Sequence, residues 1–162
     1  MLAIDTVHEM HQLICSASVY SLVLATLGAT TLISYWHGFV VGAARKAAKV
    51  GYPNTYATHE EAEADPSKYA FNCAQRGHAN YLENIPIFVP ALLLSGLKFP
   101  LTSTALGVTW IVGRGLYMVG YKNSKKGSDG KGRYKGLMGP VAQIVLTFMS
   151  LYTAYEFAVS AL

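Results

Sequence analysis

Arg76, Asn80 and Glu83 are spaced so that they share one face of a helix. They follow the pattern i, i+4, i+7, with small residues between them where another helix can approach closely. A cation, an amide and a carboxylate can together bind a ligand of mixed charge. At the mouth of an apolar segment these groups are costly to remove from water, so they usually serve a function. The alternative is a structural ion pair between Arg76 and Glu83 that sets the helix register.

A second polar face occurs in the next apolar segment, where Arg114, Tyr117 and Tyr121 follow the pattern i, i+3, i+7. Arg114 is the only charged residue expected within that helix. We interpret this face as a second wall of the same polar site. The alternative is an aromatic belt at a membrane interface, with the arginine reaching lipid headgroups.

The elements that must position these faces are predicted to be membrane helices. The chain has 162 residues, of which 52% are hydrophobic and only 14% are charged, and its mean hydropathy is +0.28. Soluble domains carry roughly a quarter charged residues. We therefore expect an all-α integral membrane protein with a single domain over residues 1–162. Its predicted fold is a bundle of four transmembrane helices, at about 13–44, 66–98, 101–121 and 136–159.

The connections between these helices differ in character. The turn at Lys98 is short, so the second and third helices should form a hairpin. Residues 50–66 are polar and carry an acidic patch, and Asp65 is expected to cap the helix that begins at Pro66. Residues 122–135 are rich in Gly, Ser and Lys, which predicts a flexible loop. Residues 1–12 are expected to be a mobile leader or an extra turn on the first helix.

The distribution of positive charge predicts the orientation in the membrane. The net charge is +4, and most of the lysines and arginines lie in residues 45–70 and 122–135. The positive-inside rule places both segments in the cytosol and the termini on the opposite side. The candidate polar groups then lie toward the cytosolic side. A nucleic-acid partner is disfavoured, because it would leave the apolar segments unexplained.

No metal site is predicted. His8 and His11 are three residues apart, but no set of ligands follows that would complete a metal site. Cys15 and Cys73 form no CxxC motif, and the predicted topology places them at different depths, so no disulfide is expected.

Two motifs make the sequence resemble a known family. They are the run from Phe71 to Asn80 with Glu83 and Pro86, and the segment from Gly113 to Tyr121 that contains GRGLY and GY. The sequence resembles the family of membrane-associated proteins in eicosanoid and glutathione metabolism (MAPEG). The resemblance covers essentially the whole chain and is greatest to the type 3 microsomal glutathione S-transferases.

This resemblance implies a homotrimer of four-helix protomers, with glutathione bound between neighbouring protomers near the cytosolic end of the helices. Arg76, Asn80 and Glu83 would bind its carboxylate and amine groups, and Arg45 would contact a carboxylate. His78 stands where the leukotriene synthase branch has a glutamine, and would reach the ligand of the neighbouring protomer. Residues of the third helix would line the site: Arg114, Tyr117 and Tyr121.

Two departures from the leukotriene synthase branch matter. That branch has a tyrosine directly after the glutamate, where this chain has Asn84, and this weakens any claim to its substrate. The branch also uses an arginine beyond the third helix to activate the thiol. The loop here has a different length, and Arg133 is the best candidate, with Lys131 and Lys135 as rivals.

The resemblance implies a glutathione S-transferase with glutathione peroxidase activity, using glutathione as co-substrate and no metal. Arg133, Arg114 and Tyr117 are the catalytic candidates. The second substrate would be a lipophilic electrophile or a lipid hydroperoxide that arrives from the bilayer lipid. The expected location is the endoplasmic reticulum, with the outer mitochondrial membrane as an alternative, and the active site should face the cytosol. The competing hypothesis is a non-catalytic lipid-binding scaffold like the 5-lipoxygenase-activating protein.

Overall fold

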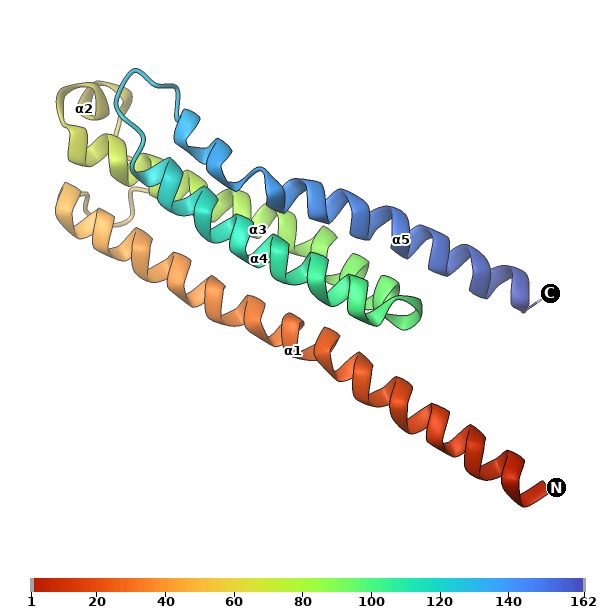
Figure 1. Cartoon of the computed structure of the whole chain (residues 1–162). Helices are drawn as coiled ribbons and strands as arrows, with labels where there is room; N and C mark the ends of the chain where they lie inside the picture. Colours follow the sequence, from red (N-terminus) through yellow and green to blue (C-terminus); the bar gives the residue numbers. More distant parts are fainter. Residues whose placement is uncertain (1, 162) are drawn as a thin grey trace.

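The computed structural model is all-helical and describes the backbone of residues 2–161 and the side chains of residues 18–161. The first helix and the last lie on opposite sides of a central hairpin, and their free ends point to the same end of the molecule without touching, while α2 (His59–Ala64) lies at the other end (Figure 1). The elements are α1 (Leu2–Ala48), α2 (His59–Ala64), α3 (Pro66–Lys98), α4 (Pro100–Lys122), the 3₁₀ helix η1 (Lys131–Gly136) and α5 (Met138–Ser160).

The first helix is longer than the expected range 13–44. It includes most of the segment 1–12, which was expected to be either a mobile leader or an extra turn on this helix, and it continues to Ala48. The side chains of His8, His11 and Cys15 lie outside the described residues. Within residues 18–161, two helical segments are long and apolar enough to cross a membrane, namely residues 18–48 of α1 and the whole of α5. Length and composition therefore support the membrane class without fixing the number of spans.

The central hairpin follows directly from the sequence. Phe99 ends α3 by donating its backbone N–H to the Ser95 oxygen at 2.9 Å, and Pro100 starts α4 at a position where no N–H is needed. Below the turn, the buried hydroxyl of Ser103 donates to that of Ser95 at 2.8 Å. This contact between small side chains allows the two helices to pack closely.

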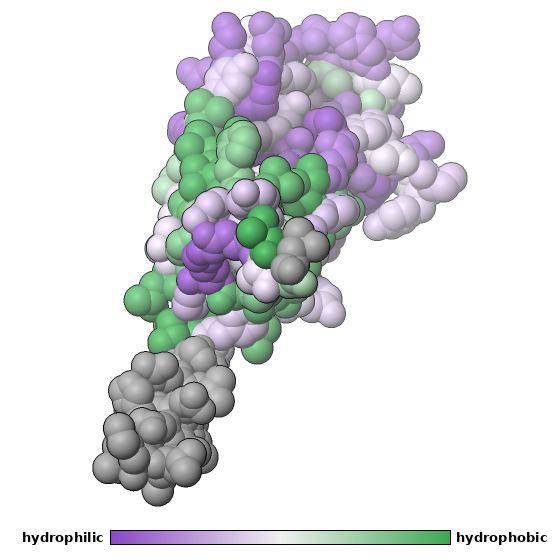
Figure 2. Space-filling view, turned by 90° about the vertical axis from the view of Figure 1, so that its right-hand side faces the viewer, coloured by the Kyte–Doolittle hydropathy of each residue, from purple (hydrophilic) through white to green (hydrophobic). Residues whose placement is uncertain are grey.

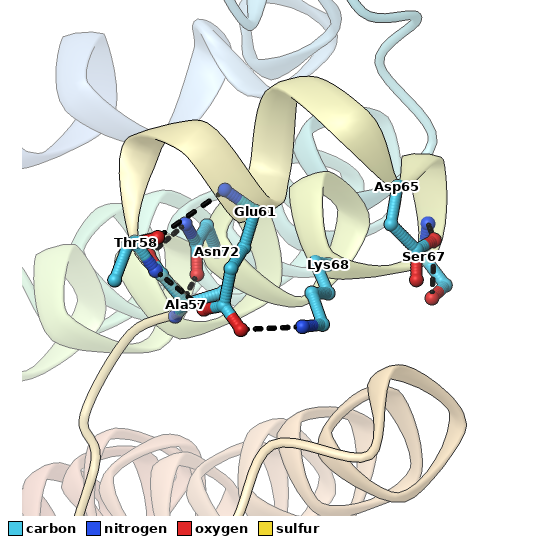
Figure 3. Close-up of polar contacts among 7 residues, drawn as sticks. All are labelled: Ala57, Thr58, Glu61, Asp65, Ser67, Lys68 and Asn72. Carbon is cyan, nitrogen blue, oxygen red and sulfur yellow. Dashed lines mark hydrogen bonds and ion pairs between the residues drawn. The ribbon is translucent and has the colours of Figure 1, made fainter.

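The acidic connection contains a short helix, α2, that the sequence did not predict. Thr58 and Glu61 form a capping box in which each side chain accepts a hydrogen bond from the other residue's backbone N–H. The amide of Asn72 bonds both backbone groups of Ala57, at 2.8 and 2.9 Å, and Lys68 pairs with Glu61 at 2.5 Å (Figure 3). The connection is therefore fixed to the start of α3, where Asp65 accepts the Ser67 N–H as expected.

The segment 122–135 is also more ordered than the sequence predicted, because η1 packs directly on α4. A Cβ atom added at Gly136 would lie 2.3 Å from the Gly113 oxygen, and one at Gly120 would lie 2.1 Å from the Gly132 oxygen. Such distances exclude any side chain. Glycines on both elements thus let two backbones touch, and this contact fixes the position of Arg133.

The outward faces of the long helices are apolar. Buried side chains, including Phe88, Leu92 and Trp110, form a core among α1, α3, α4 and α5. Large hydrophobic side chains on α1 and α5 remain exposed, such as Phe39 and Phe148. Figure 2 shows hydrophobic residues over the body of the molecule and hydrophilic residues gathered at its top. This surface is typical of a protein whose sides contact lipid or another apolar surface.

Candidate functional site

Arg76, Asn80 and Glu83 lie together on α3, as their spacing predicted. The guanidinium of Arg76 donates two hydrogen bonds to the Glu83 carboxylate, at 2.6 and 3.2 Å. The Asn80 amide nitrogen lies 3.5 Å from the same carboxylate. The Arg76 and Glu83 side chains are 45% and 53% exposed, so a ligand can reach both charges.

The second predicted face meets the first through Arg114. This side chain is only 2% exposed, and it donates to the Asn80 oxygen at 2.8 Å and to the Gln143 oxygen at 3.5 Å. Its guanidinium carbon also lies 5.1 Å from the centre of the Trp110 ring. Arg114 therefore links α3, α4 and α5, and its charge is stabilised by neutral oxygens and aromatic rings.

Tyr117 and Tyr121 continue the α4 face toward the polar end of the molecule. Their rings pack edge to face with centres 5.7 Å apart. The Arg133 guanidinium lies 5.7 Å from the Tyr121 ring and 4.6 Å from the Tyr134 ring. It donates to the Asp129 backbone oxygen at 2.5 Å. Arg133 is thus held beside Tyr121 at the rim of the site.

A cavity of about 550 Å³ opens beside these residues, between α2, the start of α3 and the loop after α4. Arg76 and Tyr121 line its inner side, and Cys73, which is a free thiol, lies between them on the wall. Across the mouth, the Lys126 ammonium pairs with the Glu63 carboxylate at 3.1 Å. The volume lies within the range of small-molecule sites, which is roughly 300–1,000 Å³.

Two carboxylates on α2 and at the start of α3 are held by local hydrogen bonds. The Lys68 ammonium, followed by the Thr58 backbone N–H, lowers the pKa of the Glu61 carboxyl below its usual value. The Ser67 hydroxyl and then its backbone N–H lower the pKa of Asp65 in the same way. Both carboxylates are therefore ionised at neutral pH. Within residues 18–161, no three His, Cys, Asp or Glu side chains are grouped so that they could hold a metal ion.

Comparison of the sequence with models of protein families relates this chain to known proteins. The model of the MAPEG family matches residues 23–155, which include both polar faces and all four long helices in part or whole. The chain belongs to the MAPEG family. The family contains glutathione-dependent transferases and peroxidases as well as non-catalytic members.

Two residues expected in the MAPEG glutathione site lie apart from Arg76 within the protomer. Arg45 donates to the Asn54 backbone oxygen at 2.6 Å and stacks on Tyr52 and Phe71, at 4.4 and 4.6 Å from the ring centres. It lines a separate cleft of about 320 Å³ at the end of α1. His78 faces α1, with its ring centre 6.0 Å from that of His37. Among residues 18–161, neither Arg45 nor His78 forms a hydrogen bond or ion pair with Arg76, Asn80 or Glu83.

Two buried residues near the candidate site, Gln143 and His37, were missed as site residues by sequence reasoning. Gln143 on α5 accepts hydrogen bonds from Trp110 at 2.7 Å and from Arg114. His37 is fully buried, with its ring centre 4.7 Å from that of Tyr81. Gln143 is the most polar side chain in the first half of α5, and a lone amide in a membrane-like helix is the signal that could have identified it.

Proposed function

We propose that this protein is a membrane-bound glutathione-dependent enzyme that conjugates lipophilic electrophiles or reduces lipid hydroperoxides, most similar to the type 3 microsomal branch. The observation that carries this proposal is the accessible pair of Arg76 and Glu83 beside the buried Arg114. A scaffold that binds only lipid has no need for a cation and a carboxylate that remain available to a ligand. The Asn80 amide between them adds a neutral hydrogen-bonding group.

The proposed binding mode uses complementary charge. Glutathione has two carboxylates and one ammonium. Arg76 can bind a carboxylate in a bidentate fork, and Glu83 can pair with the ammonium while Asn80 donates to a ligand oxygen. In the protomer Arg76 and Glu83 bind each other, so the ligand would have to replace that exposed pair. Exposed ion pairs are weak, which makes the exchange energetically possible.

The proposed chemistry requires a thiolate. A thiol of pKa about 8.5 is mostly protonated at neutral pH. Arg133, beside Tyr121, supplies a cation that stabilises the ionised sulfur. The sulfur lone pair then forms a C–S bond to an electrophilic carbon. The electron pair of the bond that breaks at this carbon departs with a leaving group or, in an addition, moves to an oxygen or carbon atom that takes up a proton. With a hydroperoxide it attacks the outer oxygen, and the O–O bond breaks. Tyr117 or Tyr121 donates a hydrogen bond or a proton to the oxygen that leaves. A second glutathione converts the resulting sulfenic acid to the disulfide and water.

We also propose the setting of this reaction. All four long helices would cross the membrane of the endoplasmic reticulum, with the end that carries α2 and η1 in the cytosol. Three copies would form a trimer, and lipid substrates would arrive between helices. The support is the cation-rich end, the apolar outer faces and membership of the MAPEG family. A trimer would also bring Arg45 and His78 toward a ligand of a neighbouring protomer.

The test is glutathione binding followed by turnover. Detergent-solubilised protein should be retained on glutathione-agarose and eluted by free glutathione. It should then consume glutathione in the presence of a lipid hydroperoxide or a lipophilic electrophile. Retention on glutathione-agarose without consumption of glutathione would contradict the proposed enzymatic activity. Absence of retention, combined with binding of an arachidonate-like lipid, would favour the scaffold related to the 5-lipoxygenase-activating protein.

A further inference from the structure

The amide of Gln143 lies at the end of a continuous series of buried hydrogen bonds that leads to the ligand-facing side of α3. We propose that Gln143 is a positioning residue for glutathione, acting through Arg114 and Asn80. This inference rests on the proposed function and adds a residue on α5 to it. Gln143 is 7% exposed and touches none of the groups assigned to the ligand except through Arg114.

The direction of each hydrogen bond follows from the chemistry of the donors. An indole N–H and a guanidinium can only donate, so both Trp110 and Arg114 must face an oxygen. The Gln143 oxygen accepts from the Trp110 nitrogen at 2.7 Å and from the Arg114 Nη2 atom at 3.5 Å. The Trp110 ring is fixed in turn by stacking on Phe88, with ring centres 3.8 Å apart. Gln143 therefore has one favourable orientation.

The same reasoning fixes Asn80. The Arg114 Nη1 atom donates to the Asn80 oxygen at 2.8 Å, so the Asn80 amide nitrogen must point the other way, toward Glu83. Asn80 then presents a donor, and not an acceptor, to the region between Arg76 and Glu83. Such a donor suits a carboxylate or carbonyl oxygen of glutathione. If the amide rotated, it would present an oxygen that repels the same group.

Burial makes this series sensitive to the loss of one acceptor. Trp110 is fully buried and Arg114 is 2% exposed, so water cannot easily replace the Gln143 oxygen. Buried donors without a partner are costly, and Arg114 has to move toward another oxygen when Gln143 is removed. Arg114 already donates to the Asn80 oxygen at 2.8 Å, and its Nε atom is buried without a hydrogen-bond partner among residues 18–161. A shift of Arg114 therefore disturbs the Asn80 amide, which lies on the same face of α3 as Glu83.

The experiment compares Gln143→Leu, Gln143→Glu and Thr147→Val in full-length protein, with glutathione affinity measured by calorimetry. Leucine is similar in size and lacks the acceptor, so Kd should rise about tenfold, the scale of one charge-assisted hydrogen bond. Glutamate restores an acceptor for both donors and should return Kd to within about threefold of wild type. Thr147 lies one turn away on α5 and donates to the Gln143 backbone oxygen, so Thr147→Val should leave Kd unchanged.

A spectroscopic measurement keeps the proposal testable if Gln143→Leu folds poorly. The chain has two tryptophans, so Trp36→Phe leaves Trp110 as the only one. Its emission should change when glutathione binds, because the ligand would contact the Asn80 amide, which is linked to Trp110 through Arg114 and Gln143. If the emission of Trp110 does not change on glutathione binding, or if a folded Gln143→Leu protein binds with wild-type affinity, the positioning role alone is overturned. A wild-type protein that does not bind glutathione would overturn the proposed function as well.

Discussion

Replacing Arg76 with alanine should separate ligand binding from folding, because its guanidinium is 45% exposed and its partner Glu83 is 53% exposed. Exposed ion pairs add little to stability, so Tm should fall by no more than about 3 °C. A charge-assisted hydrogen bond to a ligand carboxylate is worth about 1.5–3 kcal/mol. The Kd for glutathione should therefore rise about 10- to 100-fold.

Two variants sharpen this prediction. Arg76→Lys keeps the charge and loses the bidentate fork, so its Kd should lie between wild type and Arg76→Ala. Arg114→Leu removes a buried cation, leaves the side-chain oxygen of Asn80 without its donor and leaves the Gln143 oxygen with Trp110 alone. It should lower Tm by about 10 °C, which distinguishes a structural arginine from a ligand-binding one.

The measurements are calorimetric titration with glutathione and thermal unfolding, both on purified protein in the same detergent. Oligomeric state should be recorded for each variant by light scattering. If Arg76→Ala binds glutathione with the wild-type Kd but unfolds or dissociates much earlier, the pair with Glu83 is structural. The inference that the exposed Arg76 side chain serves ligand binding would then be wrong.

Three further predictions concern the polar end of the molecule. Arg133→Ala should raise the pKa of the bound glutathione thiol, read from thiolate absorbance against pH, whereas Lys131→Ala should not; an equal effect in both variants would move the role to another cation. A cysteine introduced at Ser128, in a background without Cys15 and Cys73, should react with an impermeant label from the cytosolic side, and labelling from the lumen alone would reverse the topology. Ionised Glu61 stabilises α2 above its ordinary pKa of 4.5, and this contribution is lost as pH falls through the lowered pKa of the folded state. The protection factors of the α2 amides, taken relative to the intrinsic exchange rate at each pH, should therefore fall in acid, and those of Glu61→Gln should be low at neutral pH as well.

The helices and their polar faces could be predicted because they depend on local spacing. α3 spans Pro66–Lys98 as expected, and α4 and α5 begin and end within two residues of their predicted ranges. The i, i+4, i+7 pattern also placed Arg76 and Glu83 on one face. Periodicity was sufficient here because both the helix and the ion pair form within a single segment.

The connections could not be predicted in the same way. The capping box of α2 was visible as Thr58 followed by Glu61, but six residues rarely form a stable helix alone. α2 is stabilised by Asn72, which is 15 residues away from Ala57 in the chain. η1 similarly requires the glycines of α4, and this match appears only when the two backbones are placed together.

The partner of Arg114 was missed for a related reason. Arg114 was predicted to face the site, and it does contact Asn80 across 34 positions of sequence. Gln143 is a single amide in an apolar helix and belongs to no motif or periodic pattern. Only the packing of α4 on α5 shows that this amide faces a buried guanidinium. A sequence can therefore identify the residues of a polar face more readily than the residues that orient them.

The balance of charge favours an anionic ligand at this site. Arg76 is neutralised by Glu83, whereas Arg114 has no carboxylate partner among residues 18–161 and Arg133 donates to a backbone oxygen and to the Tyr134 hydroxyl. The cavity wall also carries Glu63, which is paired with Lys126, and Asp129. With these groups included, the three arginines still leave a small excess of positive charge in this region. Glutathione has two carboxylates and one ammonium, and it gains a further negative charge when its thiol ionises. The excess positive charge therefore favours binding of the peptide and, more strongly, of the thiolate that the proposed reaction requires.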